Sequence, residues 1–224
     1  MSRRLRITVW IGCSVPVVLV AVLAGVFLAL RHEPKFYRDA LAVESEVQEK
    51  ASDQMLQRMA SLVSDVRKPG KWHARFTAEQ VNGWLAVDFV KNHRGALSPL
   101  FRNPRVSIES DRMVLACRYE GWIVSTVLTL TVEPYVPEEN VLALRIVRAR
   151  AGQVPMPLGK VLDAISDAAQ RSEWRIQWRQ AGGDPVAMLS TSTPDNSGGL
   201  AVKIETIRLG KGEINVSGST ERKK

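Results

Sequence analysis

The sequence predicts an α+β protein, in which an N-terminal transmembrane helix and a stalk helix precede a long, curled antiparallel sheet packed on two or three helices. Three observations predict this class. Residues 7–30 contain no charged side chain, residues 33–67 repeat apolar side chains at helical spacing, and apolar and polar side chains alternate through much of the chain from residue 104 onward.

The apolar run from Ile7 to Leu30 is long enough to cross a membrane. Its 24 residues would form a helix of about 36 Å, and a bilayer core needs roughly 20 apolar residues. Arg3, Arg4 and Arg6 precede the run, so the positive-inside rule places the short tail in the cytoplasm and the rest outside. The alternative is a cleaved signal peptide, but the apolar core of such a peptide is usually only about 7–15 residues long.

The composition favours a moderately basic outer domain. The chain has 31 Lys and Arg residues against 23 Asp and Glu, and three of the arginines precede the apolar run. A tethered basic domain can lie against anionic headgroups, although the same charge balance can serve only to keep it soluble. No nucleic-acid-binding motif is present, so we expect no nucleic acid among its partners.

Two helices are expected before the sheet. Residues 33–67 read as one long stalk helix that packs onto the domain, and Pro69 and Gly70 end it. The second helix begins after Thr77, which can cap it together with Gln80 in a capping box, and it ends near residues 92–95. The stalk's apolar side chains recur every four residues, at Val47, Ala51, Met55, Met59 and Val63.

The strands of the expected sheet follow from alternation. Residues 106–108, 113–119, 122–132, 142–146, 174–178, 200–204 and 214–216 alternate apolar with small or polar side chains, with turns between them. Pro155 and Pro157 break the sheet. A short amphipathic helix then presents Leu158, Val161, Leu162, Ile165 and Ala169.

These patterns divide the chain into five segments. They are a cytoplasmic tail at 1–6, a transmembrane helix at 7–30, a helical stalk at 31–70, an extracytoplasmic α+β domain at 71–219 and a disordered tail at 220–224. A polar end from Ser217 onward is expected to fray. Cys13 falls in the predicted spanning segment and Cys117 in the outer domain, so we expect no internal disulfide, and Cys117 reads as a core residue.

Catalytic and metal-binding patterns are absent from the sequence. The three histidines lack metal-ligand spacing, and no nucleophile elbow or phosphate-binding glycine loop occurs. The acidic pairs Glu138–Glu139 and Asp163–Asp167 read as a turn and an exposed helix face. We therefore expect no enzyme, no cofactor and no metal.

Basic and aromatic side chains are more informative. Two groups of arginines, near 145–150 and 171–179, can converge into an electropositive rim suited to phosphate headgroups, or can line a solvated sheet face. Trp84 and Trp178 read as core residues. Trp72, just before the capped helix, can instead lie at a membrane or ligand mouth.

Two motifs resemble a known family. The segment FTAEQVNGWL at residues 76–85 resembles the F-T-x-x-Q-x-N-x-x-L helix of the YpmS-like bacterial membrane proteins, and GQVPMPLGKVL at 152–162 is similar to their step from sheet to helix. The resemblance covers about residues 76–165. It implies a single-pass membrane protein, and the family offers no catalytic residues that could be assigned to positions in this chain. By analogy of architecture, it also implies a tubular lipid-binding domain, whose curled sheet wraps a helix over an apolar groove.

We therefore expect a non-enzymatic binding protein, outside a bacterial cytoplasmic membrane, that holds a membrane lipid or another amphiphile between sheet and helix. Arg145 and Arg148 would receive an acidic headgroup. Two alternatives are a scaffold of a cell-envelope complex, which would bind another envelope protein through the stalk and a sheet edge, and an enzyme with a deep ionisable pocket. The expected groove lining is Trp84, Leu85, Leu128, Leu130, Leu158 and Leu162.

Overall fold

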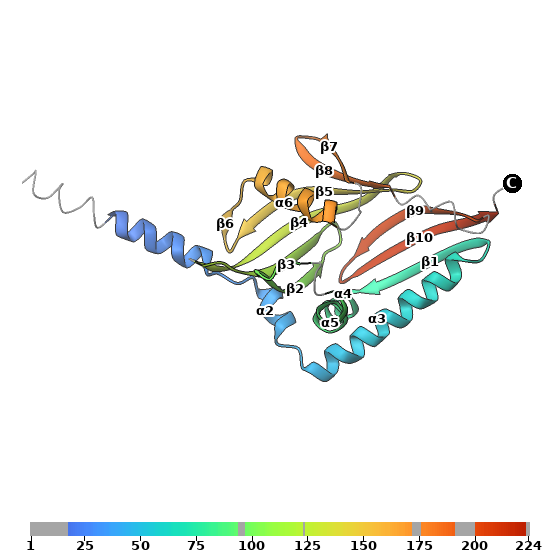
Figure 1. The fold of residues 1–224 in the computed structure, drawn as a ribbon, viewed down its shortest axis with the longest axis horizontal. Helices are drawn as coiled ribbons and strands as arrows, with labels where there is room; N and C mark the ends of the chain where they lie inside the picture. The colour runs from blue at the N-terminus through green and yellow to red at the C-terminus, as the bar shows by residue number, and fades with distance from the viewer. Residues whose placement is uncertain (1–17, 94–96, 123, 172–175, 191–199, 223–224) are drawn as a thin grey trace, which may run out of the picture.

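The α+β class is confirmed, but the strands form two sheets rather than one. A computed structural model of the chain describes residues 18–93, 97–122, 124–171, 176–190 and 200–222. Within these ranges it contains a three-stranded and a seven-stranded sheet, both antiparallel, and five helices besides the helical residues 18–30 (Figure 1). The prediction of one long sheet is wrong because the first strand pairs with the last strand, far away in sequence, and the last two strands pair with each other.

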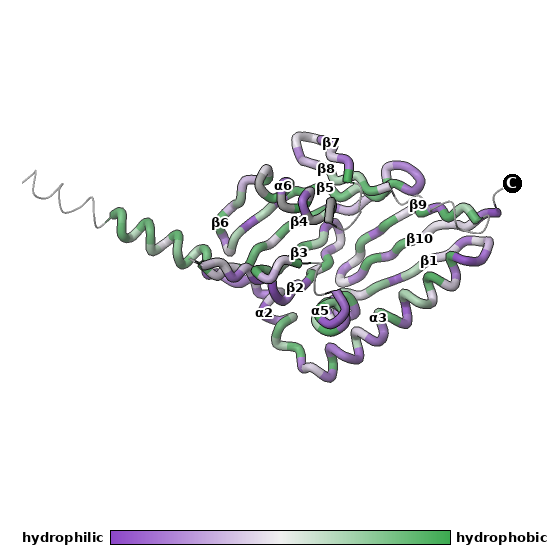
Figure 2. The backbone as a smooth tube through the Cα atoms, in the orientation of Figure 1, coloured by the Kyte–Doolittle hydropathy of each residue, from purple (hydrophilic) through white to green (hydrophobic). Residues whose placement is uncertain are grey.

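No helix within the described ranges is long and apolar enough to cross a membrane. The predicted cytoplasmic tail at 1–6 and most of the predicted transmembrane segment at 7–30 lie outside those ranges, since the description starts at residue 18. Residues 18–30 are helical and apolar, and this helix extends away from the two sheets (Figure 2).

The small sheet has the order β1-β10-β9, from β1 (Gly70–Thr77), β10 (Glu213–Arg222) and β9 (Leu200–Gly210). Sequence reasoning missed β1. It also placed a frayed tail from Ser217, which is wrong as far as Arg222, because these residues pair with β9. The Thr220 hydroxyl is buried and donates to the Val66 carbonyl oxygen at 2.9 Å, which holds this end to the stalk.

The large sheet has the order β2-β3-β4-β5-β8-β7, with the short β6 paired to β5. The predicted alternating segments from residue 106 to 146 are confirmed as strands, except that β4 begins at Ser125 and not at Trp122 as predicted, and β6 and β8 were missed. Its strands are β2 (Phe101–Ile108), β3 (Met113–Glu120), β4 (Ser125–Glu138), β5 (Val141–Ala151), β6 (Val154–Pro155), β7 (Ile176–Ala181) and β8 (Asp184–Ser190).

The predicted single stalk helix is two helices, α2 (Lys35–Leu41) and α3 (Ser45–Val66). They separate because they pack on different surfaces: α2 packs on β2, and α3 packs on α4 and β1. Tyr37 of α2 is fully buried and forms a core cluster with Ala116 and Val127 of the large sheet. Burial raises the pKa of the Tyr37 hydroxyl, which donates to the Asn103 carbonyl oxygen at 3.1 Å.

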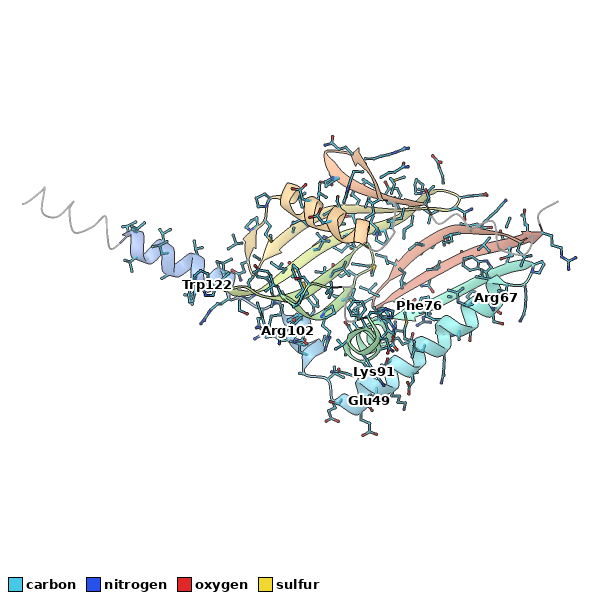
Figure 3. The ribbon with its side chains drawn as sticks, viewed as in Figure 1. Glu49, Arg67, Phe76, Lys91, Arg102 and Trp122 are labelled. Carbon is cyan, nitrogen blue, oxygen red and sulfur yellow. The ribbon has the colours of Figure 1, made fainter. Side chains whose placement is uncertain are left out.

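The predicted capping box is confirmed at the start of α4 (Ala78–Ala86). The Gln80 backbone N–H donates to Thr77 Oγ1 at 3.3 Å, and the Thr77 backbone N–H donates to Gln80 Oε1 at 3.1 Å. β1 therefore leads directly into α4, with Phe76 at the junction (Figure 3). The prediction that this helix continues to residues 92–95 is wrong, since α4 ends at Ala86 and a separate α5 (Asp88–Asn92) follows; α6 (Leu158–Arg171) follows β6 as predicted.

The outer edge of β2 is covered by other parts of the chain. Its backbone groups bond to the side chain of Asn82 on α4, to the Tyr37 hydroxyl and to the Gly212 N–H in the β9–β10 turn. An open edge strand invites pairing with another chain. This edge of the large sheet is therefore unavailable for such pairing.

Candidate functional site

One face of the large sheet carries apolar side chains in cross-strand rows. Residues directly opposite each other in an antiparallel ladder share a face, so each row forms one continuous strip. The rows are Leu128 with Cys117 and Ala151, Leu130 with Leu115 and Ala149, and Val132 with Met113 and Ile146. We call this surface the apolar face.

Helix α6 lies over the apolar face (Figure 1). Trp178 of β7 is opposite Ala187 of β8, which is opposite Leu144 of β5, two residues from Ile146 on the same face. The Trp178 Nε1–H donates to Ser166 Oγ of α6 at 2.8 Å, which fixes the side of the sheet on which the helix lies. The expected pairs Leu128 and Leu130, and Leu158 and Leu162, thus belong to the two layers that face each other.

The described residues cover the apolar face unevenly. Val132 and Ile146 are buried, whereas Leu128 and Leu130, on the central strand β4, are only half-buried. Leu115 beside them is 40 % exposed. On α6, Leu158 and Leu162 are also half-buried. A central strand of a sheet under a helix normally buries its apolar side chains fully, so the partly exposed leucines leave apolar area in reach of a ligand.

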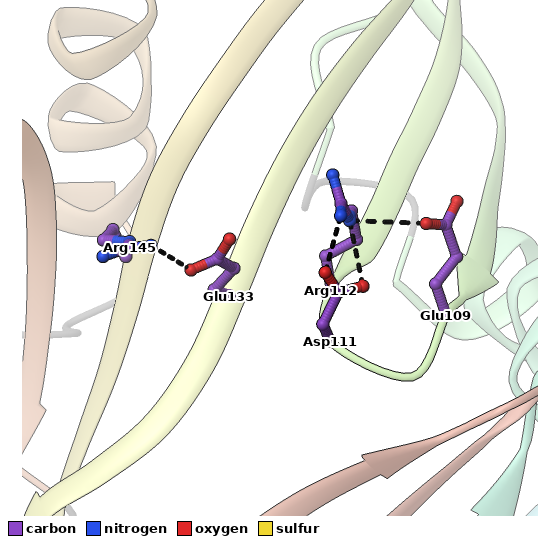
Figure 4. A network of polar contacts seen from close by, with 5 residues as sticks. All are labelled: Glu109, Asp111, Arg112, Glu133 and Arg145. Atoms are coloured by element: carbon purple, nitrogen blue, oxygen red, sulfur yellow. Dashed lines mark hydrogen bonds and ion pairs between the residues drawn. The ribbon is translucent and has the colours of Figure 1, made fainter.

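Arg145 and Arg148 lie on the opposite face of the sheet. Arg145 is opposite Glu133, and Arg148 is opposite Thr131, and both of these β4 residues alternate with Val132 of the apolar face. Arg145 Nη2 is 2.5 Å from Glu133 Oε2, within the polar surface drawn in Figure 4. The structure therefore does not bring the two arginines together with the four leucines, so the expected headgroup contact is not formed at this site.

Trp84 and Leu85 are also separate from the apolar face. They lie on α4, which packs on α3, β1 and β2. The Trp84 Nε1–H donates to Asp88 Oδ2 at 2.9 Å, and its ring centroid is 5.4 Å from that of Phe89 and 5.9 Å from that of His93. This aromatic cluster packs α4 against α5, and Trp84 and Leu85 are both half-buried there.

The two remaining expectations have different outcomes. Trp72 is 6 % exposed within β1, so the prediction that it lies at a mouth is wrong; its alternation with Lys71 and His73 could have identified the strand. Cys117 is part of the apolar face, where burial raises the pKa of its thiol to about 11. A thiol with such a pKa stays protonated and unreactive near neutral pH. The side chain of Arg171 and the whole of Arg175 lie outside the described residues.

Trp122, predicted as the first residue of a strand, lies instead in the β3–β4 turn and is 99 % exposed. The turn lies at the same end of the sheet as the C-terminal end of helix 18–30. There Thr126 Oγ1 donates to the Leu30 carbonyl oxygen at 2.5 Å, and the Gln153 N–H donates to the Ala29 carbonyl oxygen at 2.9 Å. The same end contains β6 and the start of α6. We call it the anchor end.

The described residues contain no group of three or more His, Cys, Asp or Glu side chains that could hold a metal ion. The arrangement offers apolar area under an amphipathic helix, and the cross-strand rows described above bring no ionisable group other than the Cys117 thiol onto this face. In comparisons with known proteins, no family model, no curated protein and no solved structure matches this chain.

Proposed function

We propose that this protein is a membrane-anchored, extracytoplasmic binding protein that holds a lipid or another amphiphile between the apolar face and α6. The single observation that carries the proposal is the partial exposure of Leu115, Leu128 and Leu130 beneath an amphipathic helix. Covering these side chains with a ligand's acyl chain would contribute about 25 cal/mol of binding free energy for each Å² of apolar surface removed from water. Leu158 and Leu162 would contact the ligand from the other side.

The location of the face relative to the proposed anchor agrees with this function. α6 begins directly after β6, and the Gln153 N–H just before β6 donates to the Ala29 carbonyl oxygen in helix 18–30. A ligand leaving a bilayer crossed by that helix would therefore reach the start of α6 first. Arg145 and Arg148 are left out of this ligand set, because they share a face with Glu133 rather than with the leucines.

Native mass spectrometry of the full chain, released from detergent, tests the proposal. The full chain is needed because α2 and α3 pack against the rest of the domain. We expect adducts of lipid mass that are lost when the protein is denatured. A protein that carries no lipid after purification, and takes up none from added phospholipid, would rule out the binding function.

A scaffold function is the second candidate, and one observation favours it. Leu56, Met59 and Val63 are each more than 40 % exposed along one side of α3. Isolated exposed apolar residues are ordinary, but a strip on one helix suits docking to a partner helix. Changing Met59 and Val63 to Gln would abolish capture of a stoichiometric envelope partner under this function, and would leave lipid adducts unchanged under the first.

A further inference from the structure

Trp122 is the most exposed large apolar side chain among the described residues. It is 99 % exposed, while the next, Leu28 in helix 18–30, is 68 % exposed. A tryptophan side chain buries roughly 150–250 Å² of surface when it is packed, so a fully exposed one contributes none of that burial to the stability of the fold. A ring that projects fully from the protein therefore points to a surface that covers it.

The described residues on either side of Trp122 in the β3–β4 turn are held by hydrogen bonds and an ion pair. The Gly121 N–H donates to the Val124 carbonyl oxygen at 3.1 Å, and Glu120 forms an ion pair with Arg102 of β2 at 2.9 Å. A Cβ atom at Gly121 would lie 2.5 Å from Cε1 of Tyr119, so the Tyr119 ring fills the inner side of the turn. The Trp122 ring itself does not pack on this hairpin, since it is 99 % exposed.

This turn and the helix that precedes the domain are held at the anchor end. Besides the bonds to Ala29 and Leu30, Arg118 Nη2 of β3 lies 2.5 Å from Glu33 Oε1, just after the helix. Figure 3 shows Trp122 beside the end of the helix. Two apolar features therefore project from the same end of the sheet: the helix, with its exposed apolar side chains, and the tryptophan.

The chemistry around them suits the headgroup region of a bilayer. Indole rings concentrate at the membrane–water interface, where the apolar ring and the polar N–H are both satisfied. Arg31 and His32 are exposed directly after the apolar run, and the Arg31 guanidinium carbon lies 4.5 Å from the centroid of the Phe27 ring. Cationic side chains at this level attract lipid phosphates.

We propose that Trp122 inserts into the outer headgroup region of the same bilayer that the anchor crosses. The inference rests on the membrane anchor of the proposed function and adds a second contact point to it. One helix alone would let the helix and the attached domain tilt and rotate together in the membrane. A second contact, on the β3–β4 turn, would fix the anchor end of the sheet against the membrane, so that the start of α6 opens toward the lipid.

Quenching by brominated lipid tests this contact in the full chain. The protein is reconstituted in vesicles of phosphatidylcholine and phosphatidylglycerol, with and without bromines on the acyl chains. A Trp10→Phe background removes the one tryptophan of the apolar run and leaves the other five of the six tryptophans. We expect brominated lipid to quench about one fifth of the emission, because one of the five remaining rings lies at the interface. This quenching should be absent from the Trp10→Phe/Trp122→Phe variant.

The control is Trp10→Phe/Trp84→Phe, which removes a half-buried ring on α4 and should keep the quenching. Trp122 is exposed, so its replacement by Phe leaves the fold intact. Protein released from vesicles by carbonate would overturn the anchor and this inference together. Protein that stays on the vesicles, but whose quenching does not depend on Trp122, would overturn the inference alone. Lipid adducts in native mass spectrometry test lipid binding at the apolar face separately from the anchor and from Trp122.

Discussion

Asn82 of α4 and Val106 of β2 are joined by two hydrogen bonds. The Val106 N–H donates to Asn82 Oδ1 at 2.8 Å, and Asn82 Nδ2 donates to the Val106 carbonyl oxygen at 2.8 Å. The side-chain amide thus takes the place that a neighbouring strand would occupy, and it closes the outer edge of the large sheet. The Val106 N–H and carbonyl oxygen are thus both hydrogen-bonded by one side chain, which connects α4 to the large sheet.

Replacing Asn82 with Ala should lower the free energy of unfolding by about 1–3 kcal/mol, because the Val106 N–H and carbonyl oxygen lose their partners while Val106 stays buried. Thermal unfolding of the full chain in detergent measures the change. Asn92→Ala is the matched control, since the Asn92 amide donates to Asp88 on an exposed surface. Equal stability losses in the two variants would contradict the importance of the edge contact.

Gly83 sets the separation of α3 and α4. A Cβ atom at this position would lie 2.6 Å from Ala51 Cβ and 2.7 Å from the Gln48 carbonyl oxygen. Gly83→Ala should therefore destabilise the protein by about 1–3 kcal/mol through overpacking, despite the higher helix propensity of alanine.

Gly159→Ala on α6 is the control for this position, because a Cβ atom there meets nothing within 4 Å. It should leave stability unchanged or raise it by up to about 1 kcal/mol. Comparison of the two unfolding midpoints gives the result. A tolerated Gly83→Ala would mean that α3 and α4 are not closely packed.

The Cys117 thiol makes stability depend on alkaline pH. Burial raises its pKa from 9.0 to about 11 in the folded state, so the unfolded chain loses this proton first as pH rises. Stability from this group is fully present below pH 9 and is lost between pH 9 and about pH 11. Burial also raises the pKa of Tyr37, which extends the loss to higher pH.

Unfolding in denaturant measured across this range tests the effect. Cys117→Ala should reduce the slope of stability against pH between 9 and 11, while Cys13→Ser, in the apolar run, should leave it unchanged. A wild-type curve that stays flat through this window would show that the Cys117 thiol is not protected by burial.

Local sequence patterns predicted those parts of the fold that depend on neighbouring residues. Thr77 and Gln80 are three positions apart, so their capping box depends only on neighbouring residues and could be read from the sequence. The pairing of β1 with β10 joins Phe76 to Ile214, and no local pattern reports such a contact. The stalk helix divides after Leu41 because its two halves pack on different surfaces, which is also a long-range effect.

The arginines of the candidate site show a second limit. Arg145 and Arg148 are three positions apart, which in a regular strand would place them on opposite faces. The register of β4 with β5 shifts by one residue between Thr131 and Val132, which puts both arginines on the face opposite the leucines. A bulge of this kind cannot be recognised from alternation alone. Leu128 and Leu130, in contrast, follow plain alternation and share one face of β4.

The most direct test of lipid binding compares the two faces of one strand. Leu128→Gln with Leu130→Gln changes the apolar face, and Thr129→Gln with Thr131→Gln changes the opposite face of β4 at neighbouring positions. Lipid that copurifies with the full chain is then extracted and quantified for each pair. The account predicts that the leucine variant loses most of its lipid while the threonine variant keeps it; equal lipid content in the two would contradict binding at the apolar face.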